Sequence, residues 1–147
     1  MNNYSSRKRS TKRGQRRGAA VIEFAVVAPL FLLLLAGIIE FGQAFRIEHM
    51  LSNAARRGTR SAIVHGATSS EVEQKVKTQC MRTIGVDEEG VTVRITVNGI
   101  DSEIELAEEG DEISITVSVE YSEAGTGFFA SFLSSATLSA TCTMEHE

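Results

Sequence analysis

The chain has 147 residues, a formal net charge of −4 and 42% hydrophobic residues, a length that predicts one domain. The net charge conceals an asymmetry, because seven basic residues and no acid precede Gly18, whereas 8 basic and 17 acidic residues lie between Arg46 and Glu147. This acidic remainder argues against nucleic acid as a partner. Two cysteines and three scattered histidines do not predict a metal site.

The first expected element is a membrane-spanning helix behind a basic leader, residues 1–18. From Ala19 to Ile39 the only charged residue is Glu23. In a helix this run covers about 30 Å, the hydrocarbon thickness of a bilayer. Basic residues before the run and acidic residues after it predict a cytoplasmic N-terminus. We therefore expect a single lipid-embedded pass over 19–41 in the cytoplasmic (inner) membrane, and a periplasmic or extracellular domain over 42–147.

The same helix is predicted to continue to about residue 65, where Gly66 is a natural stop. After Phe41 the pattern becomes amphipathic, which indicates an apolar stripe facing a soluble domain. The stripe consists of small and apolar residues at spacings of three and four: Ile47, Leu51, Ala54, Gly58 and Ala62. Gly58 permits a close helix–helix approach, or is simply an ordinary small residue.

A second helix is predicted to begin at Ser69 or Ser70 and to end at Gly85. Ser70 and Glu73 have the spacing of a capping box. The inner stripe of this helix is expected to contain Val72, Val76 and Cys80.

The remainder alternates with period two, which indicates half-buried antiparallel strands. Strands are predicted over 91–97, 104–106, 113–121 and 137–144, with a tight turn at Asn98-Gly99. The aromatic segment 125–133 receives no assignment. The predicted fold class is α+β, in which the long N-terminal helix extends into a small exported domain with a second helix and an antiparallel sheet of three or four strands.

Two short segments carry a family resemblance. Gly18 closes the basic stretch, and Glu23 and Phe24 follow after four intervening residues. This arrangement resembles the processing site of class IV prepilins. Residues 53–60, Asn-Ala-Ala-Arg-Arg-Gly-Thr-Arg, resemble a segment of TadE-like proteins, which are pseudopilins of tight-adherence (Flp-type) pili. The resemblance covers roughly residues 14–65.

The resemblance implies a minor pilin or pseudopilin of such a pilus, or of a related secretion apparatus, and not an enzyme. A prepilin peptidase would cut between Gly18 and Ala19, leaving Glu23 and Phe24 near the new N-terminus. The Glu23 carboxylate would then pair with the Ala19 amine of a neighbouring pilin subunit. The implied partners are membrane lipid, the peptidase and other pilin subunits, with no cofactor.

Three alternatives remain open at this stage. The protein could be an uncleaved, single-pass membrane-tethered binding or enzymatic domain, although the sequence shows no phosphate loop, nucleophile elbow or triad. Glu23 could be an interfacial carboxylate without a role. An ordinary signal peptidase could cut after Ala44, because Gly42 and Ala44 are small residues at the −3 and −1 positions relative to that cut.

Further residues are assigned from their predicted positions. Cys80 and Cys142 both face inward in an oxidising compartment, so a disulfide is predicted in preference to two buried thiols. Glu40 is expected to be a solvated carboxylate at the interface where the helix leaves the membrane on its exported side. The basic patch of Arg56, Arg57 and Arg60 is expected to pair with acids of the same chain, the alternative being an acidic partner.

Overall fold

The structure, a computed structural model, describes residues 13–64, 66–124 and 135–146. The chain divides into two compact units, Met1–Ala36 and Gly37–Glu147. The first helix, α1 (Arg13–Ala62), contributes to both units. The aromatic segment 125–133 lies outside the described residues.

The first unit is the N-terminal part of α1, which begins earlier than predicted, within the basic leader. Its large apolar side chains are exposed, and Pro29 lies inside the helix without ending it. In the described part of the chain, one helical segment, Gly18–Ala62, is long and apolar enough to cross a membrane. The predicted long apolar helix is therefore confirmed.

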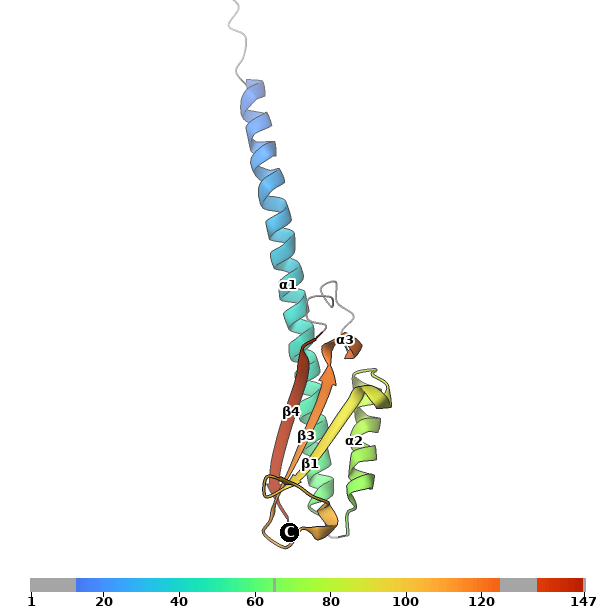
Figure 1. Cartoon of the computed structure of the whole chain (residues 1–147). Helices are drawn as coiled ribbons and strands as arrows, with labels where there is room; N and C mark the ends of the chain where they lie inside the picture. The colour runs from blue at the N-terminus through green and yellow to red at the C-terminus, as the bar shows by residue number, and fades with distance from the viewer. Residues whose placement is uncertain (1–12, 65, 125–134, 147) are drawn as a thin grey trace, which may run out of the picture. The chain divides into compact units, whose positions relative to one another are not determined.

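The second unit contains a four-stranded antiparallel sheet with strand order β2-β1-β3-β4. Its strands are β1 (Val91–Val97), β2 (Ile100–Asp101), β3 (Glu112–Glu120) and β4 (Thr137–Glu145). Figure 1 shows β1, β3 and β4 side by side. The Val and Ile side chains of β3 are buried and alternate with half-buried Ser and Thr. This alternation confirms the predicted α+β class with one sheet face against the core.

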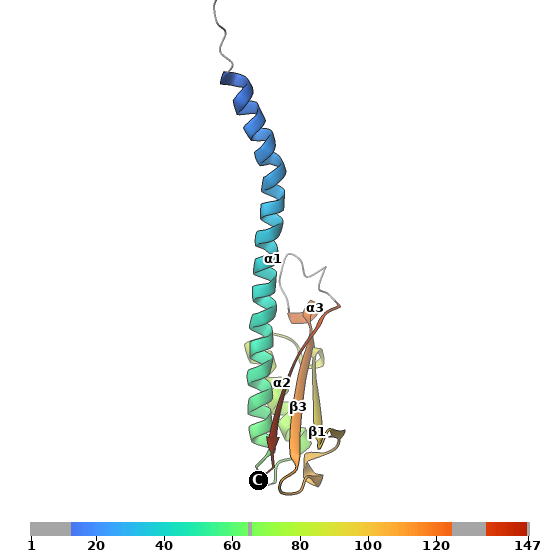
Figure 2. The ribbon, with the colours of Figure 1, turned by 90° about the vertical axis from the view of Figure 1, so that its left-hand side faces the viewer.

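The C-terminal part of α1, from Gly37 to Ala62, lies with α2 (Ser69–Thr83) on the same face of the sheet (Figure 2). Gly66 and Gly85, with φ of 82° and 87°, follow the ends of the two helices at the predicted stops. A four-residue helix, α3 (Tyr121–Ala124), follows β3 directly.

The N-cap of α2 is Thr68, two residues before the predicted Ser70. The Thr68 side chain accepts a hydrogen bond from the backbone N–H of Glu71. Thr68 and Glu71 also have capping-box spacing, so the sequence contains two overlapping signals. The buried stripe of Val72, Val76 and Cys80 is as predicted.

The predicted strand at 104–106 is instead a 3-10 helix, η2 (Ile104–Leu106), and the short strand is β2. The Asn98-Gly99 turn has φ of 52° and 78° and pairs β2 immediately with β1. The chain then crosses to the N-terminus of α2. There the backbone N–H of Ile104 donates to the Ser69 hydroxyl at 2.8 Å, so this segment bonds to a helix instead of the sheet.

The Thr59 side chain of α1 hydrogen-bonds to the edge strand β4. The Thr59 hydroxyl lies 2.9 Å from the carbonyl oxygen of Ala55 and 3.2 Å from that of Cys142. On the opposite face of the sheet, hydroxyls pair across β3 and β4. Ser114 and Thr143 are 2.6 Å apart, and Thr116 and Thr141 are 2.8 Å apart.

Candidate functional site

The residues of the predicted processing site lie on the first unit of α1. A Cβ added to Gly18 would meet no heavy atom within 4 Å, and the side chains of Glu23 and Phe24 are exposed, Phe24 by 72%. Ala19 and Glu23 are four residues apart and therefore share one face of the helix. The segment thus presents a carboxylate on an exposed apolar helix.

The segment 53–60 lies in the second unit and packs against both α2 and the sheet. Ala54, Ala55, Gly58 and Thr59 are buried, whereas the arginines of the segment are exposed. A Cβ on Gly58 would lie 2.5 Å from Cγ2 of Val76. Gly58 is therefore a point of close approach between α1 and α2, which favours the packing interpretation of this glycine.

Among the described residues, the basic patch does not form the expected ion pairs. Arg57 donates to the Gln79 side-chain oxygen at 3.3 Å. The ion pairs of the described residues are Lys77–Glu73 and Arg94–Asp101, and neither includes an arginine of the patch. The patch side chains point outward because the small residues of segment 53–60 occupy the packed face.

A groove of about 850 Å³ separates the outer faces of α1 and α2. Three cationic side chains line it, Arg57 from α1 and Lys75 and Arg82 from α2. One acidic side chain, Glu71, also lines it. The remaining lining residues are small or polar: Ala54, Gly58, Ser61, Gln74, Val76, Thr78, Gln79 and Thr83. The sequence predicted the arginine but not the groove, because residues far apart in the chain form it.

A buried carboxylate is the feature of the second unit that the sequence most clearly missed. Glu40 is only 3% exposed, so the prediction of a solvated carboxylate is wrong. It accepts a hydrogen bond from the hydroxyl of Tyr121, which is 1% exposed, at 2.5 Å. Burial, followed by this hydrogen bond, raises the pKa of Tyr121 to about 12, so the phenol remains a donor at neutral pH.

The predicted disulfide is not formed in the structure, where Cys80 and Cys142 are free thiols. Both face the core layer, but Cys80 lies on α2, which packs on β1, and Cys142 lies on β4, two strands away. Periodicity thus predicted that both cysteines face the core, but not which strand of the sheet each one lies against. Burial raises the pKa of Cys80 to about 11, which leaves almost no thiolate at neutral pH.

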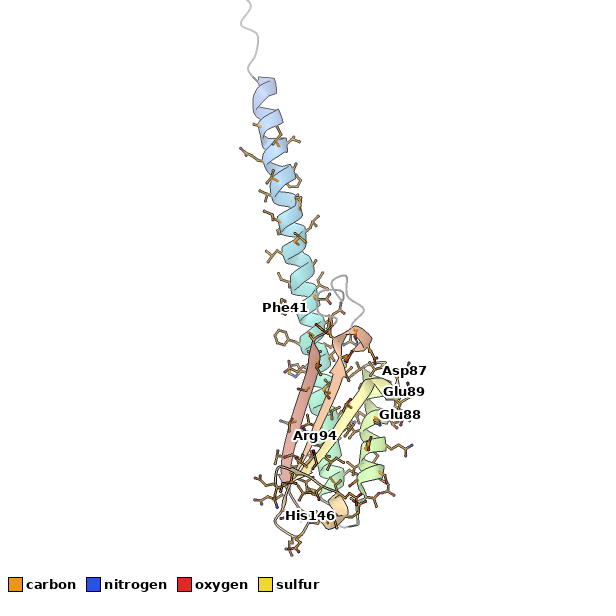
Figure 3. All side chains as sticks on the ribbon, in the orientation of Figure 1. Phe41, Asp87, Glu88, Glu89, Arg94 and His146 are labelled. Carbon is orange, nitrogen blue, oxygen red and sulfur yellow. The ribbon has the colours of Figure 1, made fainter. Side chains whose placement is uncertain are left out.

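Acidic residues gather between α2 and β1, where Asp87, Glu88 and Glu89 are consecutive (Figure 3). Glu89, Glu120 and Glu123 line a hollow of about 330 Å³ beside them. No group of three or more His, Cys, Asp or Glu in the described ranges is arranged to hold a metal ion.

The comparisons with known proteins point to one family. Residues 18–60 match the family model described as TadE-like protein. The match covers less than a third of the chain and includes both the Gly18–Phe24 segment and segment 53–60. No curated protein and no solved structure matches the chain. TadE-like proteins are structural and pilus-associated. The resemblance predicted from the sequence is confirmed: over residues 18–60 the chain is similar to TadE-like proteins.

Proposed function

We propose that this protein is a minor pilin or pseudopilin of a tight-adherence pilus or a related secretion apparatus. The observation that carries this proposal is the TadE-like match over residues 18–60, which join an exposed apolar helix to a packed domain. The charge asymmetry supports a cytoplasmic N-terminus and an exported second unit. In this function the chain is structural and acts by assembling with other subunits.

Processing supplies the second part of the proposal. A prepilin peptidase cuts between Gly18 and Ala19, and the new α-amine is largely cationic at neutral pH. The Glu23 carboxylate lies one helical turn further along an apolar surface, where an unpaired charge is unfavourable. Pairing Glu23 with the amine of a neighbouring subunit neutralises both charges and sets the axial register between helices.

Gly18→Val should leave the full-length precursor in the membrane, because a branched side chain does not fit a cleft that accepts glycine beside the scissile bond. Gly18→Ala, which adds only a methyl group, is the matched control and should be processed more completely than the valine variant. Intact mass and N-terminal sequencing of the membrane-extracted protein measure the outcome. A mature N-terminus at Ala19 in the valine variant contradicts the peptidase assignment, and Met1 in the unmodified protein favours an uncleaved tethered domain.

Glu23→Ala should insert in the membrane and be processed, yet fail to support pilus assembly. Removal of the carboxylate makes the apolar run more hydrophobic, so insertion does not suffer. What is lost is the partner of the Ala19 amine on the adjacent helix. Glu23→Asp, which keeps the charge, is the control and should retain part of the assembly. Normal pili and normal subunit crosslinking in Glu23→Ala would show that Glu23 has no pairing role.

A further inference from the structure

The groove between α1 and α2 has a charge opposite to that of its surroundings. Three of its charged side chains, Arg57, Lys75 and Arg82, are cationic, and only Glu71 is acidic. From Arg46 to Glu147, by contrast, acids outnumber bases by 17 to 8. A cationic groove in an acidic domain is complementary to acidic surfaces of the kind that this chain itself carries.

Two of the three groove cations, Arg57 and Lys75, are held by neutral groups. Arg57 donates to the side-chain oxygen of Gln79, and the Lys75 ammonium donates to the hydroxyl of Ser61 at 3.1 Å. Neither ion pair of the described residues involves a groove cation. Their charge therefore remains available to an incoming carboxylate.

The chain also carries a rigid acidic turn, residues 107–111, between η2 and β3. Asp111 fixes it, because one carboxylate oxygen accepts from the backbone N–H of Glu108 at 2.8 Å and the other from the Asn98 amide at 2.7 Å. These hydrogen bonds hold the pKa of Asp111 below its ordinary value. Glu108 and Glu109 are exposed, and their side chains bond to none of the residues within the described ranges. The turn thus presents two carboxylates on a fixed backbone.

The turn is anchored away from the groove of its own chain. The backbone N–H of Gly110 donates to the carbonyl oxygen of His146 at 3.0 Å, and the N–H of His146 donates to that of Asp111 at 2.8 Å. This attachment places the turn at the end of β4, next to His146 (Figure 3). No residue of the turn lines the groove.

We propose that the groove between α1 and α2 binds the acidic turn 107–111 of a second copy of this chain. Glu108 and Glu109 of one copy lie against Arg57, Lys75 and Arg82 of the other. Because the groove and the turn are different surfaces, the contact is heterologous and leaves a free groove and a free turn at the two ends of each pair. The contact requires neither processing at Gly18 nor a pilus, so it goes beyond the proposed function.

Zero-length crosslinking of the full chain in lipid vesicles tests the contact. A carbodiimide joins a lysine to a carboxylate only when the two are in contact. Equal amounts of normal and ¹⁵N-labelled chain make intermolecular products recognisable by mass spectrometry. The expected mixed-isotope product joins Lys75 to Glu108 or Glu109. The pair Lys77–Glu73, whose charged atoms are 2.8 Å apart within α2, supplies a same-isotope positive control.

Charge reversal separates this contact from other forms of association. A groove variant, Lys75→Glu with Arg82→Glu, and a turn variant, Glu108→Lys with Glu109→Lys, should each form about tenfold less mixed-isotope dimer, because like charges now meet and the reacting pair of Lys75 and a turn carboxylate is removed. An equal mixture of the two variants should restore the dimer, since each acidic surface again meets a basic one. In 1 M salt, where the Debye length is about 3 Å, the dimer of the unmodified chain should decline.

Protection of the buried Cys80 from thiol reagents shows whether each variant is folded. The absence of a mixed-isotope product, a product that joins other residues, or a mixture of folded variants that fails to restore the dimer would each overturn the proposal. A product that joins other residues would assign the association to a different surface. A mixture of folded variants that fails to restore the dimer would assign the groove to a different partner.

Discussion

Gly58→Ala is expected to lower the free energy of unfolding of the second unit, although alanine is the better helix former. Helix propensity favours alanine by about 0.5–1 kcal/mol, whereas overpacking a core costs about 1–3 kcal/mol. The added Cβ would lie 2.5 Å from Cγ2 of Val76 and 3.3 Å from Cδ1 of Ile115. Both neighbours are buried and β-branched, so neither can rotate freely out of the way.

The urea dependence of Cys80 labelling measures this effect in the detergent-solubilised full chain. Cys80 is fully buried and should react only when the second unit opens, and a Cys142→Ala background leaves it as the single thiol. Gly42→Ala is the matched control, because its Cβ would meet nothing within 4 Å. In a Val76→Ala background the cost of Gly58→Ala should shrink. An equal or greater stability of Gly58→Ala would show that α1 and α2 can separate without loss.

Tyr121→Phe is expected to destabilise the second unit by about 1–3 kcal/mol, because it removes the hydrogen-bond donor of a buried carboxylate. Glu40 remains 3% exposed and cannot recover the loss by hydration. In a Glu40→Leu background, where no carboxylate needs a donor, the same change should cost much less. The two substitutions form a double-mutant cycle, and the Cys80 labelling assay on its members gives the coupling energy between Tyr121 and Glu40. If the effects of the two substitutions on the free energy of unfolding simply add, the hydrogen bond is not important.

The pH dependence provides an independent measurement of the same pair. The folded pKa of Tyr121, about 12, lies above its ordinary value of 10.0. Its contribution to stability is therefore complete below pH 10 and should decline as the pH rises from 10 to 12. Tyr121→Phe should lack this decline when the two proteins are compared over that range.

The sequence predicted the elements whose signals are local. The apolar run, the helix-ending glycines and the Asn98-Gly99 turn depend on neighbouring residues, and the structure contains them. The alternation of β3 and β4 likewise identified their inward faces, which are buried in β3 and half-buried in β4. Such patterns reflect the solvent on each side of an element, so they can be recognised without knowledge of the fold.

The wrong predictions concern residues whose environment depends on distant parts of the chain. Glu40 is buried because α3 brings Tyr121 to it, 81 positions later. Cys80 and Cys142 face one core, yet their separation depends on strand order, which periodicity does not encode. Segment 104–106 alternates like a strand but bonds to Ser69 of α2. For the candidate site, the sequence identified the Gly18–Phe24 segment and the arginines, but not the groove that α2 completes.

The hydroxyl pairs across β3 and β4 have a consequence for how these strands find their alignment. Sixteen residues, 121–136, connect the two strands, so no tight turn sets their register. A slip by one residue would exchange the apolar and hydroxyl faces and is strongly disfavoured. A slip by two would again place hydroxyl opposite hydroxyl, because Ser139, Thr141 and Thr143 are alike in this respect. It would, however, move the Cys142 carbonyl by about 7 Å, out of reach of Thr59. The hydrogen bond from Thr59 of α1 therefore favours the observed register of β3 and β4 over the register shifted by two residues, which the side chains of the sheet alone distinguish poorly.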